Sequence, residues 1–137
     1  IALDPNNYLM ELLILVDALK RASAKSINVV IPYYGYSRQD RKDKPRVPIT
    51  ARLVANMLES AGVSSVLTMD LHADQIQGFF NVPVDNLHSR ALLTEAFREF
   101  DKTNLIVVAP DAGSVKLTRN VASCLGVEFA VLDKLRV

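Results

Sequence analysis

The sequence predicts an α/β protein built on a parallel β-sheet. Short, β-branched and continuously apolar segments alternate along the chain with longer segments in which apolar residues recur at helical spacing. No segment rich in Gly, Ser or Pro divides the chain. Strands that are apolar throughout are typical of a parallel sheet with helices on both faces, so we expect a doubly wound architecture.

The first half of the chain is expected to contain two helices and two strands. Helical spacing of apolar residues predicts a helix over residues 6–23, and the β-branched run at 26–32 predicts a strand that ends at a proline. After a long polar segment, a second helix around residues 54–61 is closed by Gly62, a common residue after a helix. Residues 66–70 form the next expected strand.

The second half repeats the alternation. A helix is expected from Ser89, in the N-cap position, to Phe100, followed by a strand at 105–109. A helix over 114–125, stopped by a glycine, precedes a last strand at 129–132. The stretch VPVDNLHS, residues 82–89, lies between the second and third expected helical units and is the one candidate for a seam between domains.

Composition excludes several classes of protein. The 137 residues carry 16 Lys+Arg against 15 Asp+Glu, a net charge of +1, which argues against binding of nucleic acid by bulk charge. The apolar stretch at residues 12–16, which no other stretch exceeds, is far shorter than the roughly 18 residues of a membrane span. The single Cys124 and the lack of a visible secretory signal are typical of a cytoplasmic protein.

Charged or metal-ligating side chains follow each of the four strands expected from this pattern. In open α/β sheets, ligands bind beyond the carboxyl ends of the strands, so these side chains mark a candidate site. They are the segment from Arg38 to Lys42, the pair Asp70 and His72, the turn containing Asp111, and the pair Lys134 and Arg136.

The segment from Arg38 to Arg46 has five basic and two acidic residues and follows three tyrosines. It could bind a nucleotide through phosphate charge and ring stacking, and it could move as a lid. From charge alone, a solvated surface loop is the simpler interpretation. Asp70 and His72 suit a divalent cation whose shell a ligand phosphate completes, or are an ordinary loop pair. The turn PDAGS at 110–114 could receive an anion at the following helix, or be a plain turn.

Long collinear segments resemble the ribose-phosphate pyrophosphokinases, also called phosphoribosyl pyrophosphate synthetases. The most specific are MELLILVDALKRASAKSINVVIPYYGYSRQDRKDK, PITARLVANMLESAG and TMDLHADQIQGFFNVPVDNL, and PDAGS and LDKLR follow in the family's order. The resemblance implies transfer of pyrophosphate from ATP to the C1 hydroxyl of ribose 5-phosphate, with Mg²⁺ as cofactor and AMP as the second product.

The resemblance assigns roles to three groups of residues: ATP contacts, magnesium ligands and catalytic side chains. The expected ATP contacts are Arg38, Gln39 and Asp43. The expected magnesium ligands are His72, Asp70, Asp111 and Asp85, and the expected catalytic side chains are Lys134 and Arg136. Arg136 is also expected to bind ribose 5-phosphate.

The same resemblance implies two similar phosphoribosyltransferase-like domains. Residues 1–88 would form the rear of the amino-terminal domain and residues 89–137 the front of the carboxyl-terminal one. Family members are roughly twice this length, and the loop that binds the ribose phosphate in them is not among these residues. We therefore expect the 137-residue chain alone to be inactive. In the intact protein we expect dimers that build a hexamer, with no nucleic acid or membrane partner.

Three residues depart from the family pattern. Asn81 stands where many members have an aspartate associated with metal binding, Ser114 replaces a common second glycine, and Leu135 replaces a charged residue. These departures leave open a non-catalytic subunit associated with the synthetase. A phosphoribosyltransferase is a third interpretation, which the Arg38–Lys44 segment and the DLH motif fit poorly.

Overall fold

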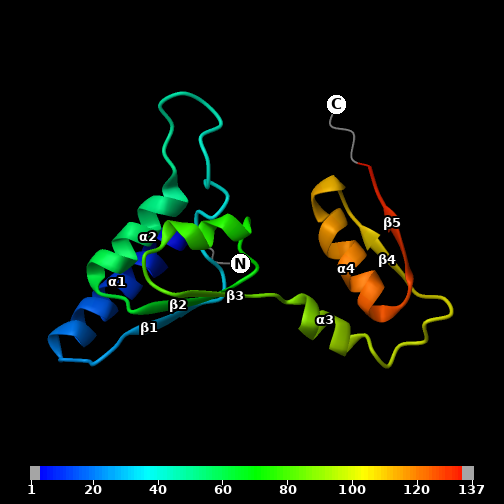
Figure 1. The fold of residues 1–137 in the computed structure, drawn as a ribbon, viewed down its shortest axis with the longest axis horizontal. Helices are drawn as coiled ribbons and strands as arrows, with labels where there is room; N and C mark the ends of the chain where they lie inside the picture. Colours follow the sequence, from blue (N-terminus) through cyan, green and yellow to red (C-terminus); the bar gives the residue numbers. More distant parts are fainter. Residues whose placement is uncertain (1–3, 134–137) are drawn as a thin grey trace. The chain divides into compact units, whose positions relative to one another are not determined.

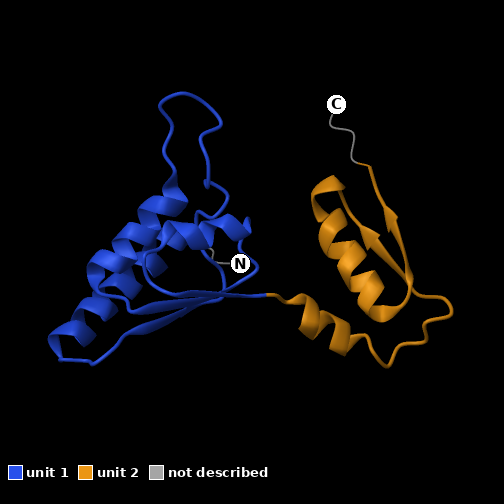
Figure 2. Ribbon diagram, in the orientation of Figure 1, with its two compact units in different colours: residues 1–87 blue, residues 88–137 orange. Residues whose placement is uncertain are grey.

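The computed structural model describes residues 4–133 and contains helices that alternate with parallel strands (Figure 1). The expected α/β class with parallel sheets is confirmed. The chain divides into two compact units, Ile1–Leu87 and His88–Val137 (Figure 2). Within the described residues, no helix is long and apolar enough to cross a membrane.

The first unit contains a three-stranded sheet with strand order β1-β2-β3, and both neighbouring pairs run parallel. Its elements in chain order are helix α1 (Pro5–Arg21), strand β1 (Asn28–Ile31), helix α2 (Thr50–Ala61), strand β2 (Ser65–Met69), 3₁₀ helix η1 (Asp74–Phe79) and strand β3 (Val84–Leu87).

Local sequence signals explain where the first two helices begin and end. The Asp4 carboxylate accepts a hydrogen bond from the Asn7 N–H at 3.2 Å, and Pro5 occupies the first turn of α1, where its missing N–H costs nothing. Lys20 and Arg21 lie in the last turn, where positive charge stabilises the helix dipole. Helix α2 ends at Gly62, whose φ of 116° suits glycine.

The core of this unit lies between the sheet and its two long helices. Val29 of β1 and Val66 of β2 are neighbours in register on one face, where they join the buried Val16 of α1 and Leu58 of α2. Helices α1 and α2 therefore cover the same face of the sheet (Figure 1). On the opposite face of the sheet, Val30 of β1 is 66% exposed.

The second unit pairs strand β4 (Ile106–Ala109) with strand β5 (Glu128–Val131) in parallel. Its helices are α3 (Arg90–Ala96), the short 3₁₀ helix η2 (Ala112–Ser114) and α4 (Val115–Leu125). Helix α4 packs on both strands, and its Val121, Ala122 and Leu125 are buried. The helix ends at Gly126 with φ of 72°.

Three elements differ from the sequence-based expectation. The stretch VPVDNLHS contains strand β3, and η1 precedes it; neither was expected. Asp85 and Asn86 interrupt the apolar run of β3, which hides its strand pattern. The helix expected to reach Phe100 ends at Ala96, beyond which Phe97 and Phe100 pack edge to face with ring centres 5.1 Å apart.

Candidate functional site

The segment that follows β1 is anchored at its base by Tyr34. This side chain is 3% exposed, and its hydroxyl donates to the Ala51 carbonyl of α2 at 2.9 Å. Its ring meets Phe80 edge to face, with centroids 5.8 Å apart. Burial, followed by the nearby charge of Glu59, raises the pKa of Tyr34 well above its ordinary value, so the hydroxyl keeps its proton and remains a donor.

Gln39 closes the base of this segment. Its carbonyl accepts a hydrogen bond from the Ala51 N–H at 3.1 Å, and its own N–H donates to the Tyr36 carbonyl at 2.9 Å. We call Arg38 and Gln39 the foot of this segment. The foot is hydrogen-bonded to α2 through Gln39, and both side chains are exposed. These two expected ATP contacts are consecutive in the sequence and therefore lie side by side.

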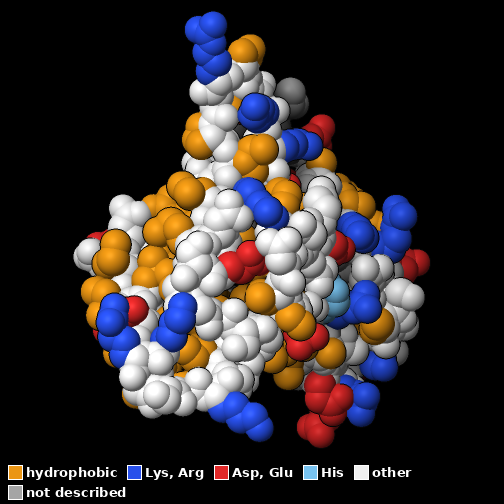
Figure 3. Space-filling view, turned by 60° about the vertical axis from the view of Figure 1, so that its left-hand side comes forward, with side chains coloured by type: hydrophobic (Ala, Val, Ile, Leu, Met, Phe, Trp, Pro, Cys, Tyr) orange, Lys and Arg blue, Asp and Glu red, His pale blue; other side chains and the backbone are white. Residues whose placement is uncertain are grey.

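Residues 40–48 form an arm that projects from the first unit between β1 and α2 (Figure 1). Lys and Arg side chains lie along this projection (Figure 3). Asp43, the third expected ATP contact, is exposed on the arm with its basic neighbours. Arg41 and Lys42 are also exposed, so their charge faces solvent.

The loop after β2 begins at Asp70, whose φ is +48°. Aspartate tolerates this left-handed conformation better than most residues. The Asp70 N–H donates to the Leu87 carbonyl of β3 at 2.9 Å, and the Leu71 N–H donates to the Asn86 side-chain oxygen at 3.2 Å. Asp70 and His72 are both exposed on this short turn at the carboxyl edge of the sheet.

Asp85 occupies a different position from Asp70 and His72. It pairs with Leu67 in the middle of β2, three residues before Asp70, which corresponds to about 10 Å along the strand. Because side chains alternate along a strand, Asp85 lies on the sheet face opposite to Asn86. Within residues 4–133, no three potential metal-ligating side chains form a cluster.

In the second unit, Asp111 follows the carboxyl end of β4 and caps the next helix. Its Oδ1 accepts hydrogen bonds from the N–H and the hydroxyl of Ser114, both at 3.0 Å. The expected catalytic residues Lys134 and Arg136 lie outside the described residues.

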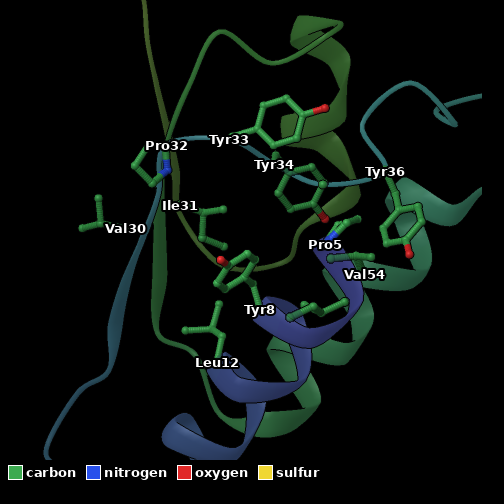
Figure 4. A pocket seen from close by; sticks show the side chains of 12 residues that line it. Pro5, Tyr8, Leu12, Val30, Ile31, Pro32, Tyr33, Tyr34, Tyr36 and Val54 are labelled. Carbon is green, nitrogen blue, oxygen red and sulfur yellow. The ribbon is translucent and has the colours of Figure 1, made fainter. Parts of the chain in front are cut away.

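One cavity near the base of the arm was not expected from the sequence. It has a volume of about 170 Å³ and is lined mainly by apolar and aromatic side chains from α1, β1 and the segment after β1. Tyr8, Tyr33, Tyr34 and Tyr36 all border it (Figure 4). Tyr8 comes from α1, so the cavity depends on a contact between segments that no local sequence pattern reveals.

The comparisons with known proteins agree with the resemblance. A family model described as the N-terminal domain of ribose phosphate pyrophosphokinase matches residues 1–62. The ribose-phosphate pyrophosphokinase of Fusobacterium nucleatum is 59% identical over 133 residues, which are 96% of this chain and 42% of that protein. The chain is related to the ribose-phosphate pyrophosphokinases.

A second relative and a solved structure extend this relationship. The ribose-phosphate pyrophosphokinase of Chlorobaculum tepidum is 58% identical over 96% of this chain and 41% of its own length. The crystal structure of the phosphoribosylpyrophosphate synthetase from Mycobacterium smegmatis has a TM-score of 0.86 and 47% identity over 96% of this chain and 45% of that chain. The chain therefore spans less than half the length of these ribose-phosphate pyrophosphokinases and shares their fold.

Proposed function

We propose that the full-length protein is a Mg²⁺-dependent ribose-phosphate diphosphokinase. The observation that carries the proposal is the 59% identity to a ribose-phosphate pyrophosphokinase across 96% of this chain. In the proposed reaction, the C1 hydroxyl of ribose 5-phosphate attacks the β-phosphorus of ATP. A new C1–O–P linkage forms, and the bond from the β-phosphorus to the bridging α,β-oxygen breaks. AMP leaves with that oxygen, and the proton of the C1 hydroxyl passes to solvent.

The proposed ATP contacts lie on the segment after β1. Arg38 offers a planar guanidinium that can donate two hydrogen bonds to a phosphate, and Gln39 lies beside it at the anchored foot. Asp43 would reach the nucleotide from the arm, whose basic side chains attract the triphosphate. An anchored foot and a projecting arm together support a segment that covers bound ATP.

The donor set of Asp70 and His72 suits a Mg²⁺ ion that retains water and phosphate oxygens. Mg²⁺ in phosphoryl-transfer sites is commonly held by one or two protein groups and by the substrate phosphates. The bound ion would neutralise charge on the transferred phosphates. Asp85 and Asp111 are proposed to contribute to magnesium binding from the resemblance, and the β2–β3 register favours a role for Asp85 apart from the Asp70 loop.

The remaining roles rest on the resemblance. Lys134 and Arg136 are proposed to stabilise negative charge on the transferred pyrophosphate, and Arg136 also to bind ribose 5-phosphate. The units Ile1–Leu87 and His88–Val137 are proposed to be parts of two similar phosphoribosyltransferase-like domains. We further propose a cytoplasmic homo-oligomer, in which dimers build a hexamer, with no nucleic acid or membrane partner.

The test is ribose-5-phosphate-dependent release of AMP by the full-length protein, measured with Arg38→Ala and His72→Ala beside it. Arg98→Ala is a matched control, because Arg98 is exposed on the second unit and pairs with Glu95. We expect activity in the parent and the control, a large loss in both site variants, and no turnover by the 137-residue chain alone. A parent protein that never releases AMP would contradict the proposal.

One observation supports a second candidate, a non-catalytic subunit that associates with the synthetase. The Asn81 side chain, at a position where the family often has an acidic metal contact, is hydrogen-bonded to Glu59 instead. Under this alternative, the full-length protein is inactive, and family-typical residues at positions 81, 114 and 135 restore activity. Activity in the parent excludes it.

A further inference from the structure

The loop that carries Asp70 and His72 joins β2 to η1. It leaves β2 through the left-handed turn at Asp70 and enters η1 at Asp74. The bond from the Asp70 N–H to the Leu87 carbonyl extends the sheet by one residue. Beyond that point, His72 lies between Leu71, whose side chain is buried in the core, and Asp74 at the start of η1.

A single side chain contacts both of those residues. Asn86 pairs with Thr68 in the sheet and is partly buried on the face that the helices cover. Its Oδ1 accepts a hydrogen bond from the Leu71 N–H at 3.2 Å, and its Nδ2 donates to the Asp74 Oδ1 at 3.1 Å. A carboxamide can accept at one end and donate at the other, which neither a carboxylate nor an apolar side chain can do.

We propose that Asn86 is a positioning residue for the Asp70–His72 loop. It ties the loop on both sides of His72 to a central point on β3, so that the carboxylate and the imidazole present one preorganised arrangement to a divalent cation. Residues that orient metal ligands in this way typically contribute about 10- to 100-fold to metal affinity. The importance of Asn86 for catalysis rests on the proposed function. Its effect on cation binding can be tested without measuring turnover.

The first experiment measures Mn²⁺ binding to the full-length protein by electron paramagnetic resonance, together with backbone hydrogen exchange over residues 70–74. In Asn86→Ala, we expect Mn²⁺ affinity to fall about tenfold or more and exchange at Leu71 to accelerate. Asn56→Ala is the matched control, because Asn56 is exposed on α2 and should change neither quantity.

Exchanging the side chains of Asn86 and Asp74 tests whether a loss of Mn²⁺ affinity comes from the lost hydrogen bond or from general destabilisation of the fold. Asn86→Asp keeps the acceptor for Leu71 but places a carboxylate against Asp74, so Mn²⁺ affinity should fall. With Asp74→Asn added, the amide at position 74 can donate to the carboxylate at position 86. Most of the lost Mn²⁺ affinity should then return. This pair also keeps the proposal testable if Asn86→Ala does not fold.

Kinetics provide a further readout. In the Asn86 variants, the apparent Mg²⁺ requirement should rise while the KM for ribose 5-phosphate changes little. The proposal is overturned if Asn86→Ala binds Mn²⁺ as the parent does, or if the exchanged pair fails to recover affinity. A parent that binds Mn²⁺ in an Asn86-dependent way but releases no AMP would refute the proposed function and leave the positioning role intact.

Discussion

The carboxylate of Glu59 on α2 accepts hydrogen bonds from both the backbone N–H and the side-chain amide of Asn81, with 2.8 Å between Oε2 and Nδ2. Asn81 follows η1, so this contact fastens the end of η1 to the helix beside it. A carboxylate cannot donate a hydrogen bond, and an aspartate at position 81 would face the charge of Glu59. The departure of Asn81 from the family pattern is therefore matched by a partner in this chain.

The first prediction concerns Asn81→Asp. We expect the free energy of unfolding of the full-length protein to fall by about 1 kcal/mol at neutral pH, because one hydrogen bond is replaced by repulsion between carboxylates. The loss should shrink in mildly acidic buffer, where one of the two carboxyl groups takes a proton. Urea unfolding at two pH values measures both effects, with Asn56→Asp as the control. Equal stability of Asn81→Asp and parent at neutral pH would contradict the prediction.

The second prediction follows from the ionisation of Glu59. Desolvation raises its pKa, but hydrogen bonds from Asn81 and Val82 and the charge of Arg52 outweigh this and hold the pKa below its ordinary value of 4.5. A depressed pKa in the folded state means that the ionised form stabilises the fold at neutral pH. That contribution should be lost as the pH falls below about 4.5 and through the lowered value. Urea unfolding as a function of pH should show a weaker acid dependence in Glu59→Gln, and an unchanged one would contradict the assignment.

The third prediction concerns Tyr34→Phe. The variant loses the hydrogen bond from the buried hydroxyl to the Ala51 carbonyl but keeps the ring contact with Phe80. We expect a loss of about 1 kcal/mol in the free energy of unfolding and weaker binding of Mg-ATP, because the foot of the arm loses an anchor. Thermal unfolding and calorimetry measure these effects. Tyr33→Phe is the control, since Tyr33 is 57% exposed, and equal effects in both variants would refute the anchoring role.

The fourth prediction separates two roles of Asp111. Asn and Asp cap helices about equally well, so Asp111→Asn should preserve the contacts with Ser114 and change the free energy of unfolding by less than about 0.5 kcal/mol. If Asp111 also contributes to magnesium binding, the apparent Mg²⁺ requirement of the full-length protein should rise about tenfold or more. Asp111→Ala, by comparison, should lower stability as well. An unchanged Mg²⁺ requirement in Asp111→Asn would confine Asp111 to capping.

The fifth prediction compares the two glycines that end helices. Gly126 has a left-handed φ of 72°, and a Cβ there would meet no atom within 4 Å. Gly126→Ala should therefore cost only about 1 kcal/mol. Gly62 has a left-handed φ of 116°, which is farther from the value of about 57° that other residues adopt in this region, and a Cβ would lie 2.9 Å from the Lys20 side chain. Gly62→Ala should therefore lower the urea midpoint more than Gly126→Ala does. The reverse order would show that neither the φ of residue 62 nor its contact with Lys20 disfavours alanine at this position.

Helices and strands with an uninterrupted pattern could be predicted from the sequence. The apolar spacing of residues 6–23 anticipated α1, and Gly62 marked the end of α2. Strand β3 could not be predicted, because its Asp85 and Asn86 break the apolar run that identifies a buried parallel strand. Its pairing with β2 is a long-range contact, which local periodicity does not reveal.

Part of the candidate site could be selected from the sequence, because it follows directly after an expected strand. The rule that ligands bind beyond strand carboxyl ends selected Asp70 and His72, which lie on one turn. The hydrogen bonds that join Asn86 with Leu71 and Asp74, and the bond that Asn81 donates to Glu59, depend on side chains that meet only after folding. No motif or spacing in the sequence points to either contact.

The anchored foot of the arm has a consequence for limited proteolysis. Trypsin cleaves after lysine and arginine, and the exposed Arg41 and Lys42 lie beyond the hydrogen bond that joins Gln39 to Ala51. A cut after either residue would leave β1 paired with β2 and Tyr34 bonded to α2, so the nicked protein should stay folded. The arm is thus a place where the chain can be opened, or a short tag inserted, with little disturbance to the sheet beneath it.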